Sequence, residues 1–184
     1  MAREIHFSFI DSREKVIEPK RENNNPQYYL MKAIAVFQGR LRDSYVVFSQ
    51  SSPVERVYIN CFVEHLPKNS LHGFHIHTFG NLLSRDCKSC GGHWNPHNKH
   101  HGSLRARESH AGDLGNLETD NNGKAYITFS TSKITLFGKN SIIGRSVVVH
   151  SREDDLGRGR NAESLITGNA GSRLDCAVIG IMNF

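Results

Sequence analysis

The stretch GFHIHTFGN, residues 73–81, opens with alternating side chains, and this alternation decides the fold. Successive residues of a β-strand point to opposite faces of a sheet, so His75 and His77 would share one face and Phe74 would lie on the other. Two imidazole rings placed two positions apart can chelate one metal ion, but they can also be ordinary histidines on a solvated face. The stretch therefore predicts a strand and leaves the role of its histidines open.

From residue 31 onward the chain consists of short runs of the same kind. They alternate or are rich in β-branched residues, and turn residues separate them. Eight runs are expected to be strands: residues 31–39, 44–50, 54–64, 71–77, 113–119, 123–131, 145–151 and 174–184. Asn122 and Gly123 favour a hairpin turn because both tolerate positive φ. With no convincing amphipathic helix, we expect an all-β fold, an eight-stranded antiparallel Greek-key barrel or sandwich.

Two segments do not resemble strands, roughly residues 78–112 and 151–173. Both are rich in Gly, Asn, His and charged residues. Loops of this length inside a compact domain usually carry function. We therefore expect two long functional loops.

Length and composition indicate one folded domain. The chain has 184 residues, of which 38% are hydrophobic and 22% charged, a balance typical of a globular core. Residues 1–30 are polar and charge-balanced, with an Asn run before Pro26, and are expected to form an N-terminal extension outside the domain of residues 31–184.

Charge and hydropathy exclude some partners. The net charge of +5 suits an anionic partner, but Lys and Arg are spread along the chain without a patch for nucleic acid. No stretch is apolar enough to span a membrane, and the N-terminus lacks the apolar segment of a secretory signal. We therefore expect no nucleic acid, no membrane and a cytoplasmic location.

Histidine is concentrated in one part of the chain. Nine of the eleven histidines lie between His65 and His110, which points to metal. A Zn²⁺ ion takes four N, O or S ligands, and the candidates in the first loop and at the start of the strand after it are His93, His97, His100, His101, His110 and Asp113. The set His93, His101, His110 and Asp113, at intervals of eight, nine and three, would serve, but six candidates compete for four places. His150, at the end of a predicted strand, could add a further ligand.

A different metal site is also open. The spacing of Cys87, Cys90 and His93 could begin a structural zinc knuckle that binds nucleic acid, with His97 or His101 as the fourth ligand. Such a knuckle would leave the pair His75 and His77 unexplained.

Several long motifs together resemble the Cu,Zn superoxide dismutase family. They are GFHIHTFGN, HAGDLGN, IIGRSVVVH, DDLG and TGNAGSRLDCAVIGI, and the resemblance runs from MKAIAVFQG at residue 31 to the end of the chain. It implies an antioxidant oxidoreductase that converts superoxide into oxygen and hydrogen peroxide. The implied cofactors are copper, cycling between Cu²⁺ and Cu⁺, and an adjacent structural Zn²⁺.

The resemblance also implies roles for individual residues. The copper ligands would be His75, His77, His93 and His150, and the zinc ligands His93, His101, His110 and Asp113. His93 would bridge the two ions as an imidazolate and carry a proton to peroxide, which makes it catalytic. Asp154 matches an aspartate that hydrogen-bonds a copper histidine and a zinc histidine together.

Other matched residues lie near the implied copper. Arg173 matches an arginine that attracts superoxide, and Thr167 matches a residue that narrows the channel beside it. Cys87 and Cys176 match the family's disulfide. Cys90 lies where the family has no regular cysteine and could compete by disulfide exchange, whereas Cys61 is expected to be a small buried hydrophobe.

The implied assembly is a homodimer, and a copper chaperone is a possible partner. Apolar interface positions of the family are matched by Phe79, Gly80, Ile143, Gly144, Gly180 and Ile181. The chain departs from the family at Ala162 and Ile166, which replace a common glutamate and a common lysine. A copper-delivery protein with a dismutase-like domain is the alternative, but such domains tend to lose copper ligands, and all four are present.

Overall fold

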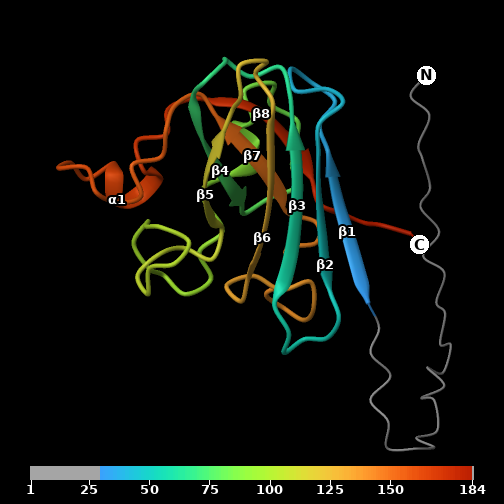
Figure 1. Ribbon diagram of the computed structural model, residues 1–184. Helices are drawn as coiled ribbons and strands as arrows, with labels where there is room; N and C mark the ends of the chain where they lie inside the picture. Colours follow the sequence, from blue (N-terminus) through green and yellow to red (C-terminus); the bar gives the residue numbers. More distant parts are fainter. Residues whose placement is uncertain (1–29, 184) are drawn as a thin grey trace, which may run out of the picture.

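The computed structural model describes residues 30–183, so the proposed N-terminal extension lies, apart from Leu30, outside the described residues. In the described part, nine strands form two antiparallel sheets (Figure 1). The first sheet has the order β6-β3-β2-β1-β9 and the second the order β5-β4-β7-β8. The pairs β3–β6 and β4–β7 join strands that are not consecutive in the chain, as in a Greek key. The predicted all-β class is confirmed.

The strands are short and match the predicted runs. Their bounds are β1 Met31–Val36, β2 Tyr45–Gln50, β3 Val57–Val63, β4 Leu71–His77, β5 Asp113–Glu118, β6 Ala125–Thr131, β7 Ser146–His150, β8 Arg173–Val178 and β9 Gly180–Ile181.

The last predicted run is two strands. β8 pairs with β7 in the second sheet, whereas β9 pairs with β1 in the first. Between them Ile179 is buried, and its N–H donates to the carbonyl of Arg145 at 2.9 Å. The chain thus crosses from one sheet to the other within a few residues, which adds a strand that alternation alone does not show.

The predicted hairpin at Asn122 and Gly123 is wrong. Gly123 has a φ of 75°, but Asn122 is not among the residues with positive φ, and β5 and β6 belong to different sheets. The turn is held by Asp120, whose Oδ1 accepts the N–H groups of Asn122 at 2.8 Å and Lys124 at 2.9 Å. A carboxylate therefore closes a turn that carries the chain across the core.

The core lies between the two sheets. Alternate residues of the first sheet, such as Phe48 and Ile59, pack against Phe74 and Ile76 of β4 in one buried cluster. Cys61 is fully buried in this cluster, as expected, and burial raises the pKa of its thiol to about 12. Because Phe74 and Ile76 face this core, the other face of β4 is available for a site.

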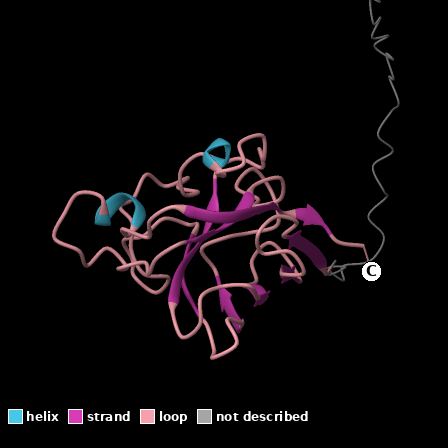
Figure 2. Cartoon of the chain, turned by 90° about the horizontal axis from the view of Figure 1, so that it is seen from above, coloured by secondary structure: helices cyan, strands magenta, loops and turns pink. Residues whose placement is uncertain are grey.

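Two long loops connect the strands of the second sheet. Residues 78–112 join β4 to β5, and residues 151–172 join β7 to β8. They contain the two helical segments in the described part, η1 at Lys88–Cys90 and α1 at Ser164–Thr167, which lie at the periphery in Figure 2. Among residues 30–183, no helix has the length and apolar character needed to cross a membrane.

Candidate metal centre

The strand β4 carries His75 and His77 on the face that turns away from the core. Both side chains are buried, and His75 lies opposite Val148 of the neighbouring strand β7. β7 ends at His150, which is also buried. The two strands therefore bring three rings together at one end of the second sheet.

The first group of possible ligands consists of His75, His77, His93 and His150. One ring nitrogen from each lies within 4.8 Å of the others. His77 Nε2 is 3.3 Å from His150 Nε2, and the ring centroids of His75 and His93 are 4.1 Å apart. Such crowding of basic nitrogens is unfavourable unless a cation accepts their lone pairs.

Hydrogen bonds to the other ring nitrogens orient this group. His77 Nδ1 donates to the carbonyl of Gly91 at 2.8 Å, and His75 Nε2 donates to Asp154 Oδ2 at 2.8 Å. The second nitrogen of each ring then carries no hydrogen and has a free lone pair. Within residues 30–183, His75 Nδ1 and His93 Nε2 are buried without a hydrogen-bond partner. Two buried ring nitrogens without hydrogen-bond partners, in a group whose nitrogens lie close together, are suited to bind a metal ion.

The second group consists of His93, His101, His110 and Asp113. Asp113 Oδ1 is 2.9 Å from His93 Nδ1 and 3.2 Å from His110 Nδ1. His101 Nδ1 is also 2.9 Å from this oxygen, but without the alignment of a hydrogen bond. Four ligands about 2.0 Å from a tetrahedral ion are about 3.3 Å from one another. The spacing of these atoms therefore fits one Zn²⁺-sized ion.

The His93 ring belongs to both groups. Its Nδ1 lies beside Asp113 in the second group, while its Nε2 has no partner and is buried near His75. His93 and His77 also form an isolated β-bridge, which fixes the backbone of the first loop against the end of β4. One imidazole can thus present a nitrogen to each of two adjacent ions.

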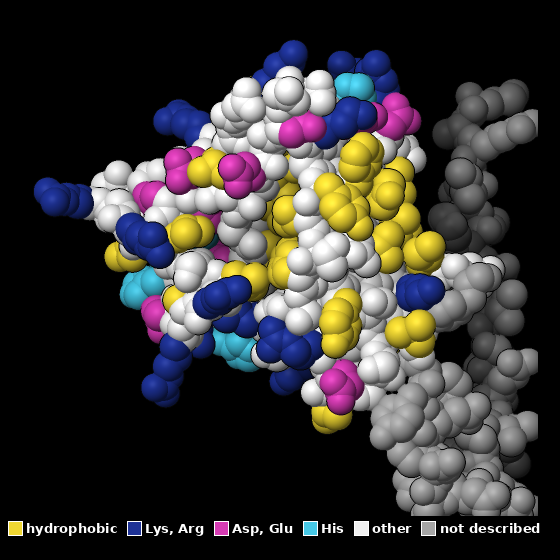
Figure 3. Space-filling model, in the orientation of Figure 1, with side chains coloured by type: hydrophobic (Ala, Val, Ile, Leu, Met, Phe, Trp, Pro, Cys, Tyr) yellow, Lys and Arg dark blue, Asp and Glu magenta, His cyan; other side chains and the backbone are white. Residues whose placement is uncertain are grey.

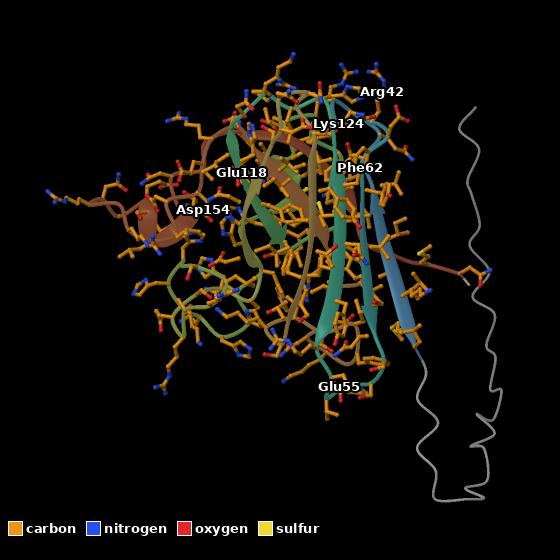
Figure 4. All side chains as sticks on the ribbon, in the orientation of Figure 1. Arg42, Glu55, Phe62, Glu118, Lys124 and Asp154 are labelled. Atoms are coloured by element: carbon orange, nitrogen blue, oxygen red, sulfur yellow. A yellow bond between two sulfur atoms is a disulfide. The ribbon has the colours of Figure 1, made fainter. Side chains whose placement is uncertain are left out.

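Asp154 links the two groups by a hydrogen bond to one histidine of each. Its Oδ2 accepts from His75 Nε2 at 2.8 Å, and its Oδ1 accepts from His101 Nε2 at 2.7 Å. It is fully buried on the side where the long loops project (Figure 4). Gly168, with a φ of 66°, passes so close that a Cβ there would overlap Asp154 Oδ1. A residue larger than glycine would displace this carboxylate.

Burial keeps the rings of the first group neutral. It lowers the pKa of His75 to about 4 and the pKa values of His93 and His150 to about 3 each, and the pKa of His77 also lies well below its usual value. The loss of hydration disfavours the charged form of each ring, and the neighbouring histidines add to this effect. Neutral imidazoles are the form that binds metal ions.

The carboxylates have the opposite effect in the second group. Burial alone would lower the pKa of His101, but the adjacent carboxylates of Asp113 and Asp154, the second of which accepts a hydrogen bond from its ring, raise it to about 9. Burial would likewise raise the pKa of both carboxyl groups, yet the histidine donors hold the pKa of Asp154 at about 2 and that of Asp113 well below its usual range. Both carboxylates are therefore charged at neutral pH.

A cavity of about 720 Å³ opens onto the first group. Its lining includes His77, His93, His150, Thr167 and Arg173. The guanidinium of Arg173 donates to the carbonyl oxygens of Cys87 at 2.5 Å and Gly91 at 2.6 Å. These two bonds hold the cation at the cavity wall and leave other N–H groups of the guanidinium for a bound anion.

The cysteines pair as the resemblance implies. Cys87 and Cys176 form a disulfide, and Cys90 is a buried free thiol that lies against it. Cys90 Sγ donates to the carbonyl of Asn81 at 3.4 Å. Because the Cys87 sulfur is bonded to Cys176, the knuckle of Cys87, Cys90 and His93 does not form.

The structure leaves two candidates outside both groups and adds residues that the sequence did not single out. His97 and His100 are exposed. His72 is buried, and its Nδ1 donates to the backbone carbonyl of His150 at 2.9 Å. Asn116 exchanges two hydrogen bonds with the backbone of Asp154, at 2.7 and 2.8 Å. His72 lies two positions before Phe74 in β4, so the alternation of the strand places both side chains on the same face. This alternation could have predicted that His72 is buried.

A β-sandwich with two adjacent groups that share one histidine defines a protein able to bind two metal ions. Comparisons with known proteins agree with this geometry. The family described as "Copper/zinc superoxide dismutase (SODC)" matches residues 43–179. The chain is 48% identical to "Superoxide dismutase [Cu-Zn] 5" of Dictyostelium discoideum over 151 residues, which cover 82% of this chain and 98% of the relative.

Fungal proteins show the same similarity. "Superoxide dismutase [Cu-Zn]" of Schizosaccharomyces pombe is 48% identical over 83% of this chain and 99% of its own, and that of Saccharomyces cerevisiae is 44% identical over 84% and 100%. The chain belongs to the copper/zinc superoxide dismutase family.

Proposed function

We propose that this protein is a superoxide dismutase in which His75, His77, His93 and His150 hold copper and His93, His101, His110 and Asp113 hold zinc. The observation that carries the proposal is the His93 ring, which offers one nitrogen to each group. The reaction consumes two superoxide ions and two protons and yields O₂ and H₂O₂. A copper ion held by the first group would supply the redox chemistry, one electron taken from one superoxide and returned to another, and a zinc ion in the second group would undergo no redox change.

Arg173 binds the substrate anion in this proposal. Its charge is permanent, and its position is set by two backbone carbonyls on the wall of the cavity that His77 and His150 also line. An anion in this cavity can accept hydrogen bonds from the guanidinium while it lies against the first group of histidines. His93 Nε2, buried without a partner beside the same cavity, is the atom that would carry a proton to peroxide.

The mouth of the cavity determines how the anion enters. Lys88, Arg152 and Arg173 contribute positive charge to its lining, whereas Asp86 and Glu163 contribute negative charge. Lys88 is paired with Asp86 at 2.8 Å, and Ile166 adds an exposed apolar side chain. Lys and Arg side chains are prominent around the long loops (Figure 3). The field that attracts superoxide therefore comes from several spread cations.

Thr167 is proposed to narrow this channel beside Arg173. Its hydroxyl, on the last residue of the short helix α1, donates to Oε1 of Glu163, which precedes that helix, at 2.7 Å. This bond fixes the Thr167 side chain at the wall of the cavity that Arg173 also lines.

A copper-delivery module is the main alternative function. Such a module would bind copper but would not need an oriented arginine at an open cavity. The complete first group and the position of Arg173 favour an enzyme.

Metal content and superoxide-dependent turnover of the purified chain test the proposal. We expect one copper and one zinc per chain, with rapid dismutation, and we expect His150→Ala to lose copper and activity while it keeps zinc. His97→Ala, which changes an exposed histidine, is the matched control and should keep both ions and full activity. Copper binding without turnover would favour the delivery module, and zinc alone would exclude both functions.

We also propose a homodimer, a cytoplasmic location and copper loading by a chaperone. The dimer is supported by the exposure of Phe79, at 58%, and of Ile181, at 73%, since large apolar side chains at the surface often mark an interface. Gly80, Ile143, Gly144 and Gly180 are the other proposed interface positions. Sedimentation should show a dimer that Ile181→Glu converts to a monomer. A monomeric parent chain would contradict this assembly.

A further inference from the structure

Lys133 follows β6 and reaches into the first long loop. Its ammonium donates to the carbonyl oxygen of Ala106 at 2.6 Å, to the hydroxyl of Ser109, and to the carbonyl oxygen of Ser103 at 3.5 Å. These three acceptors belong to one seven-residue stretch, 103–109. A lysine in the connection between β6 and β7 thus holds a loop that connects two strands of the second sheet.

The ammonium of Lys133 is only partly exposed, and within residues 30–183 no carboxylate lies within ion-pair distance of it. Burial lowers its pKa, and the nearby charge of Asp113 opposes that shift. An ammonium has three N–H donors, and a partly buried one is tolerated only where they are satisfied. The three contacts with the loop meet this need, so lysine and loop depend on each other.

The loop that Lys133 holds lies between two proposed ligands, His101 and His110. Stretch 103–109 contains no helix or strand, so its shape depends on individual hydrogen bonds. Asp113 Oδ2 fastens its two ends by accepting the N–H groups of Gly102 at 3.0 Å and His110 at 2.8 Å. Lys133 fastens the middle.

We propose that Lys133 is a positioning residue for the second metal group, because it holds residues 103–109 in the conformation that aims His101 and His110 at one ion. The inference rests on the proposed zinc site. It adds that a cation outside the ligand set, in the connection between β6 and β7, organises the loop before the ion binds. Residues that orient metal ligands typically change metal affinity by about 10- to 100-fold when they are removed.

The test compares the zinc affinity of Lys133→Met, which keeps most of the aliphatic stem, with that of the full parent chain. We expect zinc to bind about 10- to 100-fold more weakly in competition with a chromogenic chelator. Lys133→Arg, which keeps a cation with several donors, should recover part of the affinity. Lys139→Met, an exposed lysine of the same connection between β6 and β7, is the matched control and should bind zinc like the parent.

Hydrogen exchange of the metal-free chains provides a readout that needs no ion. In Lys133→Met, the amides of residues 103–110 should exchange faster than in the parent, whereas those of β4 should not change. If Lys133→Met does not fold, Ser109→Ala removes one acceptor alone and should weaken zinc binding to a smaller extent. Equal zinc affinity and equal exchange in a folded variant would overturn the inference. A parent chain that binds no zinc would instead overturn the proposed function.

Discussion

Arg173 Nη1 lies 2.5 Å from the carbonyl oxygen of Cys87, to which it donates a hydrogen bond across 86 positions of sequence. The sulfur of Cys87 is bonded to Cys176, three residues after Arg173. The arginine and the disulfide therefore close a small ring of contacts between the first loop and β8. The disulfide and the cation that is proposed to bind the substrate therefore depend on the same backbone segment.

Removal of the Arg173 guanidinium should be the most damaging charge change at the cavity. We expect Arg173→Ala to lower kcat/KM about ten- to a hundredfold, because the anion loses both attraction and hydrogen-bond donors. Arg158→Ala, which removes an exposed cation of the second loop, should change it less than about twofold. Superoxide decay in stopped-flow experiments measures both. Comparable losses for the two variants would contradict the assignment.

Loss of the disulfide should affect stability and rate together. The bond joins cysteines that are 89 positions apart in the sequence, so Cys176→Ser is expected to lower the free energy of unfolding by about 2–4 kcal/mol. It should also lower kcat/KM, because the Cys87 carbonyl no longer holds Arg173 firmly. Urea denaturation and peptide mapping provide the measurements. Cys90→Ser should retain the Cys87–Cys176 bond, and a mixture of bonds in the parent chain would show that Cys90 competes.

Neutralisation of Asp154 should weaken zinc binding by the second group, because Asp154 orients the ring of His101. Asp154→Asn leaves one oxygen to accept from two rings, so zinc affinity should fall about 10- to 100-fold. Glu153→Gln changes the adjacent exposed carboxylate and serves as the control. Chelator competition on both variants provides the comparison. An affinity of Asp154→Asn equal to that of Glu153→Gln would show that the link between the groups has no effect on the ion.

The stability of the metal-free chain should decrease on both sides of about pH 6.5. Folding lowers the pKa of His75 to about 4 and the pKa values of His93 and His150 to about 3 each. The stabilisation from these neutral rings is present above the unfolded value near 6.5 and is lost as the pH falls toward 3, by about 1.4 kcal/mol per pH unit for each ring.

The contribution of His101 to stability changes with pH in the opposite direction. Its folded pKa is raised to about 9, so its contribution is complete below pH 6.5 and is lost as the pH rises through 9. Urea denaturation of the chelator-treated protein from pH 5 to 9 should therefore show the highest stability near neutral pH, with the steeper loss on the acid side. A flat profile from pH 5 to 7 would be inconsistent with neutral buried rings.

Much of the fold can be predicted from the sequence because alternation directly reports which face of a strand is buried. The pattern of β3, with Val57, Ile59 and Cys61 buried and the residues between them exposed, is an example. The change of sheet at Ile179 and the crossing at Asn122 could not be predicted in this way. Both depend on how the two sheets close over one core, and no local pattern contains that information.

The site was less accessible to local reasoning. Spacing alone left six candidates for four places around one ion, and only the motifs shared with a known family separated His101 and His110 from His97 and His100. The carbonyls of Cys87 and Gly91 that hold Arg173 have no signature in the sequence, because every residue has a carbonyl. Lys133 was equally inconspicuous, since its partners are mostly backbone atoms of a distant loop.

The two groups that share His93 become complete at different stages of synthesis. All members of the second group lie between residues 93 and 113, so they are present once about three fifths of the chain has been synthesised. The first group also needs His150, which lies 73 positions after His77, and closing so long a loop requires both sheets to have formed. A nascent chain therefore contains every proposed ligand of one ion well before it contains every proposed ligand of the other.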